Sequence, residues 1–293
     1  MNKMHWKSIL LYMSSSFLIV IFNKIILTGY SFPSIAYLML WQSVLSTVFF
    51  WFKSKQKLNI SILPVCLINI ANIFLGLNAA GNLNVAMFTA LRRVSIFVTM
   101  VSQWYFLNKS VSKPVVVSVI AIIVGAFIAA IDDLTFDAAG YAFAMANNIL
   151  TAASQIATKK AMQDGWEKET ILFCTSFVMA IVSYFTSQAS FQTSDFEHWG
   201  DIGFQVAYVG SMTMGLIINW AVAWVIEEND ALTLAIAGST KAGLLSTLVC
   251  AGILDPTYVF SMVNFVGLQI SMCASFTYVY YAKAHTKAKG KNE

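Results

Sequence analysis

Residues 114–131 read PVVVSVIAIIVGAFIAAI and carry no charged side chain. An apolar run of this kind approaches the ~20 residues that a helix needs to cross the hydrocarbon core of a bilayer. The whole chain has the same character, because 58% of its 293 residues are hydrophobic, 11% are charged, and the mean hydropathy is +0.69. Soluble domains contain about 25% charged residues, so the composition excludes a soluble enzyme or a disordered chain. It predicts an all-α, polytopic membrane protein.

Similar apolar runs recur along the chain and predict ten transmembrane helices. They cover residues 6–27, 34–52, 62–82, 84–107, 114–131, 138–162, 169–189, 203–226, 231–254 and 257–282. We expect a single transmembrane domain over residues 1–293. It would contain two five-helix halves, residues 6–131 and 138–282, and a basic cytosolic tail at residues 283–293.

The charges of the connecting loops predict the orientation. With ten spans, the lysines of the loops and tails fall on the side of the two termini, whereas the opposite loops hold acids but neither Lys nor Arg. Basic loops stay in the cytosol, so both termini are predicted to be cytosolic. One cytosolic loop departs from the pattern with Glu227, Glu228 and Asp230. Two glycosylation sequons, at Asn59 and Asn108, also fall on the cytosolic side and are predicted to stay unmodified.

The sequence does not contain the residue patterns that several classes of function require. The cysteines lie inside apolar runs without metal-ligand spacing, and the histidines, His5, His198 and His285, lie in loops or tails. We therefore expect no metal, no cofactor and no enzymatic activity. A membrane-embedded transferase is the alternative from another class of function. The net charge of +4 is not gathered into a basic block, so the lipid bilayer and not nucleic acid is the expected large partner. The sequence leaves open whether the protein forms a homodimer.

Cationic side chains lie within the apolar runs. Arg92, Arg93 and Lys241 lie about eight to ten residues into their runs, which is ~12–15 Å deep at the rise of an α-helix. A charge at that depth costs at least ~2.5–3.5 kcal/mol, so each marks a candidate functional site. Lys24 and Lys159 lie nearer run ends, where snorkelling to the interface is an alternative.

The substrate is the remaining source of negative charge for these cations, because no Asp or Glu lies deep in any run. Arg and Lys suit phosphate groups. The residues alone therefore predict a carrier of phosphorylated or otherwise anionic metabolites. A receptor or scaffold that transports nothing has no evident need for such cations.

The two halves repeat this charge pattern. Lys24 in the first run corresponds to Lys159 in the sixth, and Arg92 and Arg93 in the fourth correspond to Lys241 in the ninth. Five helices per half reverse the orientation of the second copy, as in inverted-repeat transporters. Small residues at four-residue spacing also predict close helix packing. They form the ladders Ala121-Gly125-Ala129, Ala235-Ser239-Gly243 and Gly267-Ser271-Ser275.

Further motifs resemble one transporter family. Residues 87–93 read MFTALRR and resemble the M-F-T-x-L-R-[RK] segment of nucleotide-sugar transporters in the drug/metabolite transporter superfamily. The fringe connection-like UDP-sugar transporters are the most similar group. Later matches follow in the same order: Asp133-Leu134, Gly140-Tyr141, Thr151-Ala152-Ala153, Thr158-Lys159, Asn229, Ala231-Leu232-Thr233, Gly238, Lys241 and Asn264-Phe265-Val266-Gly267-Leu268.

The resemblance implies a ten-helix fold that exchanges a cytosolic nucleotide sugar for a lumenal nucleoside monophosphate across a Golgi or endoplasmic reticulum membrane. Phe173 aligns with the F-Y-N-N motif of GDP-mannose transporters, but the Tyr and both Asn are absent here. A UDP-sugar is therefore favoured, with a GDP-sugar transporter or a sugar-phosphate or other organic-anion carrier as alternatives. The tail residues Lys289 and Lys291 resemble an endoplasmic reticulum retrieval signal, so that membrane is the alternative location to the Golgi.

The candidate substrate site combines the charged and polar residues of both halves. Lys241 and one of Arg92 and Arg93 are expected to bind the diphosphate, with Lys24 and Lys159 as cations nearer opposite faces. The base or ribose would contact Phe173, Thr175 and Asn148. The sugar hydroxyls would contact Thr89 in the fourth run and Ser239 and Thr240 in the ninth, where Gly238 is also a candidate. Core packing is the alternative role for Phe173, and bonding to the helix's own backbone is the alternative for the three hydroxyls.

Overall fold

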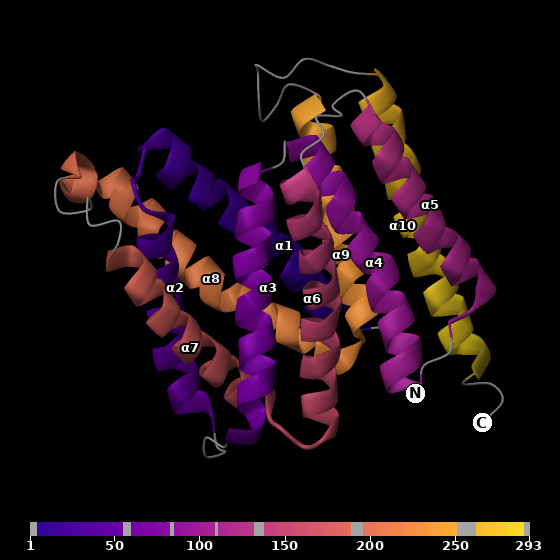
Figure 1. The fold of residues 1–293 in the computed structure, drawn as a ribbon, viewed down its shortest axis with the longest axis horizontal. Coiled ribbons are helices and arrows are strands. Elements are labelled where there is room, and N and C mark those ends of the chain that lie inside the picture. Colours follow the sequence, from indigo (N-terminus) through magenta and orange to yellow (C-terminus); the bar gives the residue numbers. More distant parts are fainter. Residues whose placement is uncertain are drawn as a thin grey trace. The chain divides into compact units, whose positions relative to one another are not determined.

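The computed structural model describes residues 5–54, 60–82, 85–108, 111–131, 138–188, 196–250 and 262–289. Most of these residues are helical, and no strand occurs among them, which confirms the all-α class (Figure 1). The α-helices are α1 (Trp6–Lys24), α2 (Ile35–Lys53), α3 (Leu63–Asn82), α4 (Val85–Leu107), α5 (Lys113–Ala130), α6 (Ala138–Gln163), α7 (Lys168–Gln188), α8 (Ile202–Glu228), α9 (Ala231–Cys250) and α10 (Met262–Lys289). A π-helical turn, η1 (Ile25–Gly29), continues α1, and short 3₁₀ turns form η2 (Ile60–Ile62) and η4 (Glu197–Gly200).

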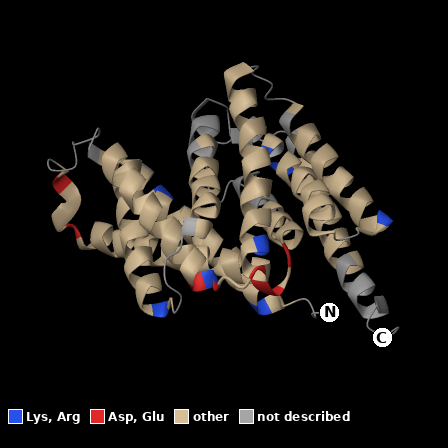
Figure 2. Ribbon diagram, turned by 60° about the horizontal axis from the view of Figure 1, so that its bottom comes forward, with Lys and Arg blue, Asp and Glu red and all other residues tan. Residues whose placement is uncertain are grey.

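Four helical stretches are long and apolar enough to cross a membrane by their length and composition. They are Trp6–Leu27, Ile35–Lys53, Lys168–Ser187 and Ile202–Glu228. The described residues also form shorter apolar helices at Leu63–Ile73, Lys113–Ala129 and Ala231–Thr240. Figure 2 shows helices that are almost free of charge along their length. The membrane character is thereby confirmed, and the count of ten spans stays a prediction.

Local sequence signals account for several helix starts. The hydroxyl of Ser34 accepts a hydrogen bond from the Tyr37 backbone N–H at 3.2 Å and caps α2. Pro114 stands in the first turn of α5, where its missing N–H has no helical partner to lose. The Asp201 carboxylate accepts from the Gly203 N–H at 2.7 Å at the start of α8. These caps satisfy backbone donors that a helix leaves open at its first turn.

The chain forms two compact units, and each unit takes helices from both halves of the sequence. The first unit contains Met1–His5, Ala71–Lys160 and Glu228–Glu293. The second contains Trp6–Ile70 and Ala161–Glu227. Helices α3 and α6 therefore each contribute residues to both units.

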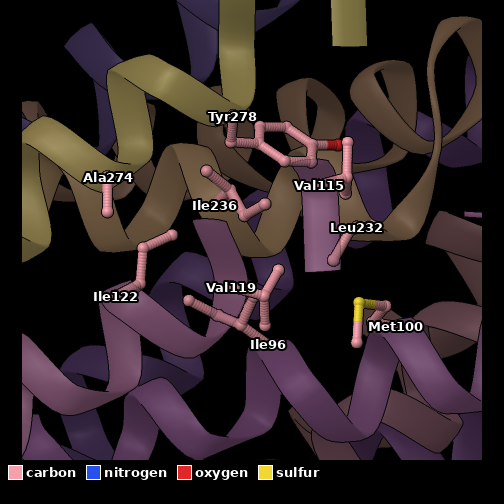
Figure 3. Close-up of a cluster of buried hydrophobic side chains, with 9 residues drawn as sticks. All are labelled: Ile96, Met100, Val115, Val119, Ile122, Leu232, Ile236, Ala274 and Tyr278. Atoms are coloured by element: carbon pink, nitrogen blue, oxygen red, sulfur yellow. The ribbon is translucent and has the colours of Figure 1, made fainter. Parts of the chain in front are cut away.

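In the first unit, α4, α5, α9 and α10 pack around one apolar cluster (Figure 3). Its central side chains are almost completely buried; they include Ile96 on α4, Val119 and Ile122 on α5, and Ile236 on α9. Tyr278 on α10 closes the cluster and lies 3.4 Å from the Thr233 hydroxyl. Burying large aliphatic side chains contributes roughly 1.5–3 kcal/mol each, so this cluster is a main source of cohesion within the unit.

Small residues let α5 and α10 approach closely. A methyl group added at Gly125 would lie 2.7 Å from both the Gly267 carbonyl oxygen and the Ser271 amide nitrogen. The predicted ladders on α5 and α10 thus pack against each other, as expected for small residues at four-residue spacing. The ladder on α9 ends at Gly243, whose side-chain environment lies outside the described part.

In the second unit, α2 packs along α7, and α8 carries an aromatic cluster. Phe204 and Tyr208 on α8 contact Phe32 through a tilted and an edge-to-face ring pair. Trp199 contacts both of them, and also Tyr37, edge to face. A smaller cluster contains the cysteines Cys66 and Cys174 beside aliphatic residues. These two buried cysteines behave as apolar core residues.

The acidic residues between α8 and α9 all have partners. Glu227 pairs with Lys168 within the second unit, and Glu228 pairs with His5 Nδ1 at 3.1 Å within the first. Asp230 accepts from the Thr233 N–H at 2.7 Å and caps α9. The departure of this loop from the basic cytosolic pattern therefore has a structural cause, because these carboxylates fix helix ends and the N-terminal segment.

Gly267 offers a test of the α5–α10 contact. Gly267→Ala is expected to lower stability by about 1–3 kcal/mol, because the added methyl would lie 2.6 Å from the Gly125 carbonyl oxygen and 2.8 Å from Ala129 Cα, and backbone cannot yield cheaply. Thermal unfolding of the purified protein in detergent measures the change. Gly200→Ala is the matched control, since nothing lies within 4 Å of its added methyl. Equal melting temperatures for the two variants would contradict the tight contact.

Candidate functional site

The adjacent arginines of α4 have different surroundings. Arg93 is buried, with 4% of its surface exposed, and one terminal nitrogen donates to the Ser271 hydroxyl on α10. Ser271 in turn donates to the Ile122 carbonyl on α5 at 2.8 Å. Arg93 is thereby tied into the packing of α4, α5 and α10. Its Nε and second terminal nitrogen have no hydrogen-bond partner among the described residues.

Arg92 is exposed and lies on another face of α4. It shares that face with the polar residues Thr99 and Gln103, which follow seven and eleven residues later. The exposed apolar residues Phe97 and Val101 project from the opposite face, where a membrane protein meets lipid. Arg92 therefore stands with the polar residues of α4 and not with the apolar ones.

Helix α6 presents a matching polar face through residues spaced three or four apart, namely Asn148, Thr151, Gln155 and Lys159. Asn148 is almost fully buried and donates through Nδ2 to the Leu91 carbonyl of α4 at 2.8 Å. The Thr99 hydroxyl donates to Gln155 Oε1 at 3.4 Å, and Lys159 is buried. The polar faces of α4 and α6 therefore meet; we call Arg92, Thr99, Asn148, Gln155 and Lys159 together the α4–α6 polar face.

Sequence reasoning missed part of this face. It named Asn148 and Lys159 as substrate contacts but not Gln155. It quoted the neighbouring Thr151 only within a motif; the Thr151 hydroxyl donates to Asn72 Oδ1 on α3 at 2.6 Å. The signal was present, because polar residues at every third or fourth position of an otherwise apolar helix mark one inward face. Thr99 was missed in the same way.

The candidates on α9 lie in the first unit, and α9 packs against α4. Gly238 is half-buried, and the buried Ser239 hydroxyl has no hydrogen-bond partner within the described ranges. Thr240 is buried and donates to the Ile236 carbonyl of its own helix at 2.9 Å, as the structural alternative predicted. Thr89 lies on α4 and Lys241 on α9, but their side chains lie outside the described residues.

The remaining candidates belong to the second unit. Lys24 is exposed at the end of α1, where the helix widens into the π-helical turn η1. Phe173 is buried, stacks on Phe177 with ring centroids 6.0 Å apart, and contacts Trp51 at 5.2 Å. Thr175 accepts from Asn69 Nδ2 at 3.4 Å. Phe173 thus takes part in core aromatic packing, which was its alternative role.

These side chains are suited to binding a ligand through charge and hydrogen bonds. Within the described residues, no three His, Cys, Asp or Glu side chains lie close enough together to hold a metal ion. The α4–α6 polar face instead offers two cations, two amides and a hydroxyl, and the sequences of α4, α6 and α9 contain no Asp or Glu. Such a set suits a ligand that carries negative charge and hydrogen-bonding groups.

The chain matches the model of a known transporter family over residues 6–279, described as the Triose-phosphate Transporter family. The chain belongs to this family. It is 34% identical to the "UDP-sugar transporter UST74c" of Drosophila melanogaster, covering 98% of this chain and 80% of that protein. It is 33% identical to the human "Nucleotide sugar transporter SLC35D2", covering 93% and 85%. The resemblance stated from the motifs is confirmed.

More distant similarities complete the comparison. The "GDP-mannose transporter GONST1" of Arabidopsis thaliana is 25% identical over 98% of this chain and 92% of its own length. One solved crystal structure superposes with a TM-score of 0.66 at 13% identity, covering 96% of this chain and 99% of that one. At that identity the superposition speaks for the fold alone.

The contact between Arg93 and Ser271 can be tested by a double-mutant cycle. Ser271→Ala is expected to cost about 1–3 kcal/mol, because it removes the hydrogen-bond partner of a buried guanidinium. Arg93→Met removes the charge that needs the partner, so the double variant should recover most of that loss. Thermal unfolding of the four proteins provides the cycle. Ser275→Ala is the control, since that hydroxyl donates only to the Ser271 carbonyl of its own helix at 2.9 Å. Additive losses in the double variant would rule out the coupling.

Proposed function

We propose that this protein is a nucleotide-sugar antiporter that imports a UDP-sugar into the Golgi lumen in exchange for a nucleoside monophosphate. The endoplasmic reticulum is the alternative membrane. The observation that carries the proposal is the α4–α6 polar face, where Arg92 and Lys159 lie on helices that contain no acidic residue. The nucleotide-sugar class is supported by the names of the relatives at 33–34% identity.

Within this proposal, Arg92 is the arginine that binds the diphosphate, together with Lys241 on α9. Arg92 is exposed on a polar face, whereas Arg93 is buried and engaged with Ser271. A substrate can reach the first side chain without separating α4 from α10. Lys24 and Lys159 then attract the anion nearer the two membrane faces.

The uncharged candidates contact the rest of the substrate in this proposal. Asn148, Phe173 and Thr175 take the base or ribose. Ser239, whose buried hydroxyl lacks a partner within the described part, takes a sugar hydroxyl with Thr89. The case for Thr240 as a sugar contact is weaker, because its hydroxyl donates a hydrogen bond to the Ile236 carbonyl of its own helix.

The packing of the helices supports an inverted repeat of five. In the second unit α2 packs along α7, and in the first unit α4 packs against α9 and α5 along α10. Each pair joins helices that occupy equivalent positions in the two halves of the sequence. A pseudo-twofold axis between inverted halves brings equivalent elements together in this way. Rocking of the two halves around the substrate is then the proposed transport step.

Exposed aromatic residues mark the ends of three helices. Trp51 and Phe52 end α2 next to Lys53, and Tyr280 and Tyr281 lie near the end of α10, ahead of Lys283. A similar group, Trp104, Tyr105 and Phe106, ends α4. Aromatic side chains beside lysines are typical of the membrane interface. All three helix ends fall on the side predicted to be cytosolic.

A sugar-phosphate carrier is the second candidate, because the family model bears the name of triose-phosphate transporters. Both candidates require cations for phosphate. They differ in the need for groups that contact a base and ribose, so substrate competition separates them.

Transport assays in liposomes test the proposal directly. Purified protein in vesicles preloaded with UMP is expected to take up labelled UDP-sugars, and vesicles without nucleotide should take up little. GDP-sugars, CMP-sugars and triose phosphates complete the panel. Exchange of triose phosphates without UDP-sugar uptake would favour the second candidate.

The proposed roles of the arginines predict different phenotypes. Arg92→Ala and Lys241→Ala are expected to lower exchange at least tenfold with little change in melting temperature, because each loses a charge-assisted contact to phosphate of about 1.5–3 kcal/mol. Arg92→Lys should retain part of the activity. Uptake per folded protein in the same vesicles measures this. Full exchange by the folded alanine variants would refute the assignment.

Glycan mapping tests the orientation. Asn59 and Asn108 are expected to stay unglycosylated in cells, because oligosaccharide transfer takes place in the lumen and both sequons are predicted to face the cytosol. A sequon engineered into a predicted lumenal loop, between residues 189 and 195, serves as the positive control. A glycan on Asn59 or Asn108, detected by a mobility shift that a glycosidase reverses, would overturn the topology.

A further inference from the structure

Three polar side chains on separate helices of the second unit form a hydrogen-bonded relay. Gln42 on α2 donates through Nε2 to the Ser211 hydroxyl on α8 at 2.8 Å. Ser211 donates in turn to Asn23 Oδ1 on α1 at 2.6 Å. Ser211 is fully buried, while Asn23 and Gln42 are half-buried. The relay therefore ends in two amides that remain accessible.

Helix α8 is shaped to hold this relay. A methyl group added at Gly215 would lie 3.2 Å from Gln42 Cγ and Cδ, so the missing side chain makes room for the glutamine. Gly210 likewise makes room for Phe22, which directly precedes Asn23. A methyl group added at Gly210 would lie 2.8 and 2.9 Å from two ring atoms of Phe22. Two glycines on α8 thus seat α1 and α2 on either side of Ser211.

The direction of the relay fixes which atoms remain available. Asn23 uses its oxygen to accept from Ser211, so its Nδ2 keeps two N–H donors. Gln42 uses one N–H to donate, so its Oε1 acceptor and its second N–H remain. Within the described part of the chain, no other hydrogen bond occupies these atoms. Purely structural glue between helices would more commonly use both ends of each amide, because unsatisfied polar groups are costly away from water.

We infer that the Asn23–Ser211–Gln42 relay reads the nucleobase of the substrate and selects uracil over guanine. This inference rests on the proposed function, because it assigns a specificity role within nucleotide-sugar transport. With the base on the relay, Asn148, Phe173 and Thr175 are left to contact the ribose. Asn23 directly precedes Lys24, one of the cations proposed to attract the substrate. One amide of the relay and this cation thus occupy successive positions at the end of α1.

The pattern of donors and acceptors decides the selectivity. The Watson–Crick edge of uracil presents acceptor, donor, acceptor. The free groups of the relay supply the complement, with Gln42 giving one acceptor and one donor and Asn23 giving a second donor. Guanine also satisfies the amide of Gln42 through its O6 and N1–H, but its N2 amino group meets the N–H donors of Asn23. Cytosine presents an acceptor at N3, which opposes Gln42 Oε1.

Ser211 is the residue that holds this pattern, since it stops both amides from turning over. It contacts the two amides and not the base, so it is a positioning residue. Without it, Asn23 can present its oxygen to guanine. Ser211→Ala is therefore expected to lower the selectivity for UDP over GDP about tenfold, as a single base contact commonly contributes, while UDP-sugar exchange changes less than about threefold.

The measurement is competition in liposomes, in which UDP and GDP inhibit uptake of a labelled UDP-sugar by the full-length protein. The ratio of their inhibition constants does not depend on how much protein is folded. Thr213→Ala is the matched control, because this α8 hydroxyl donates to the Val209 carbonyl of its own helix at 2.8 Å. The control should keep the selectivity of the unmodified protein.

A second variant protects the test if Ser211→Ala does not fold. Asn23→Asp replaces the N–H donors with an acceptor that can pair with the guanine amino group, so it should shift selectivity toward GDP. If the unmodified protein prefers UDP and both variants keep that preference, the inference is wrong and the proposed function stands. If the unmodified protein carries no nucleotide sugar, the proposed function fails and the inference fails with it.

Discussion

Polar groups inside a bilayer must find partners within the protein, because lipid offers none. This constraint governs most of what distinguishes one helix from another here. Arg93 is held by Ser271, Asn148 by the Leu91 carbonyl, and Gln42 by Ser211. Each of these bonds joins two helices, so these polar side chains hold the helices of each unit in register.

The close approach of helices depends on residues that contribute no bonds of their own. Gly125 and Gly267 let α5 pack closely against α10. Gly215 on α8 makes room for Gln42 on α2. With lipid as apolar as leucine, helices gain little from apolar burial alone and rely on dispersion contacts at short range. The aromatic cluster around Phe204 shows the other solution, in which large rings fill the space between a helix end and its neighbouring loop.

Much of the fold could be predicted from the sequence, because a membrane span can be recognised by its length and its apolar composition. Helix ends at Lys53, Leu107 and Asn82 fall within a residue of the predicted runs. The ladders on α5 and α10 were also readable, since four-residue spacing of small residues has one geometric meaning. The grouping of α4 with α9 and of α2 with α7 into separate units was not, because contacts between distant segments leave no local signal. The sequence predicts candidate residue types for the site, but the partners of Arg93, Thr240 and Phe173 depend on helix rotation. Composition alone does not encode that rotation.

Arg92 and Arg93 show that helix rotation gives even neighbouring residues different surroundings. Successive residues of a helix point about 100° apart, so two identical neighbours belong to different parts of the molecule. One stands on a polar face, and the other is enclosed beside Ser271. Position 93 can therefore exchange charge for apolar volume together with a compensating change on α10. Under the proposed function, position 92 has no such route and keeps its cation for as long as the cargo is an anion.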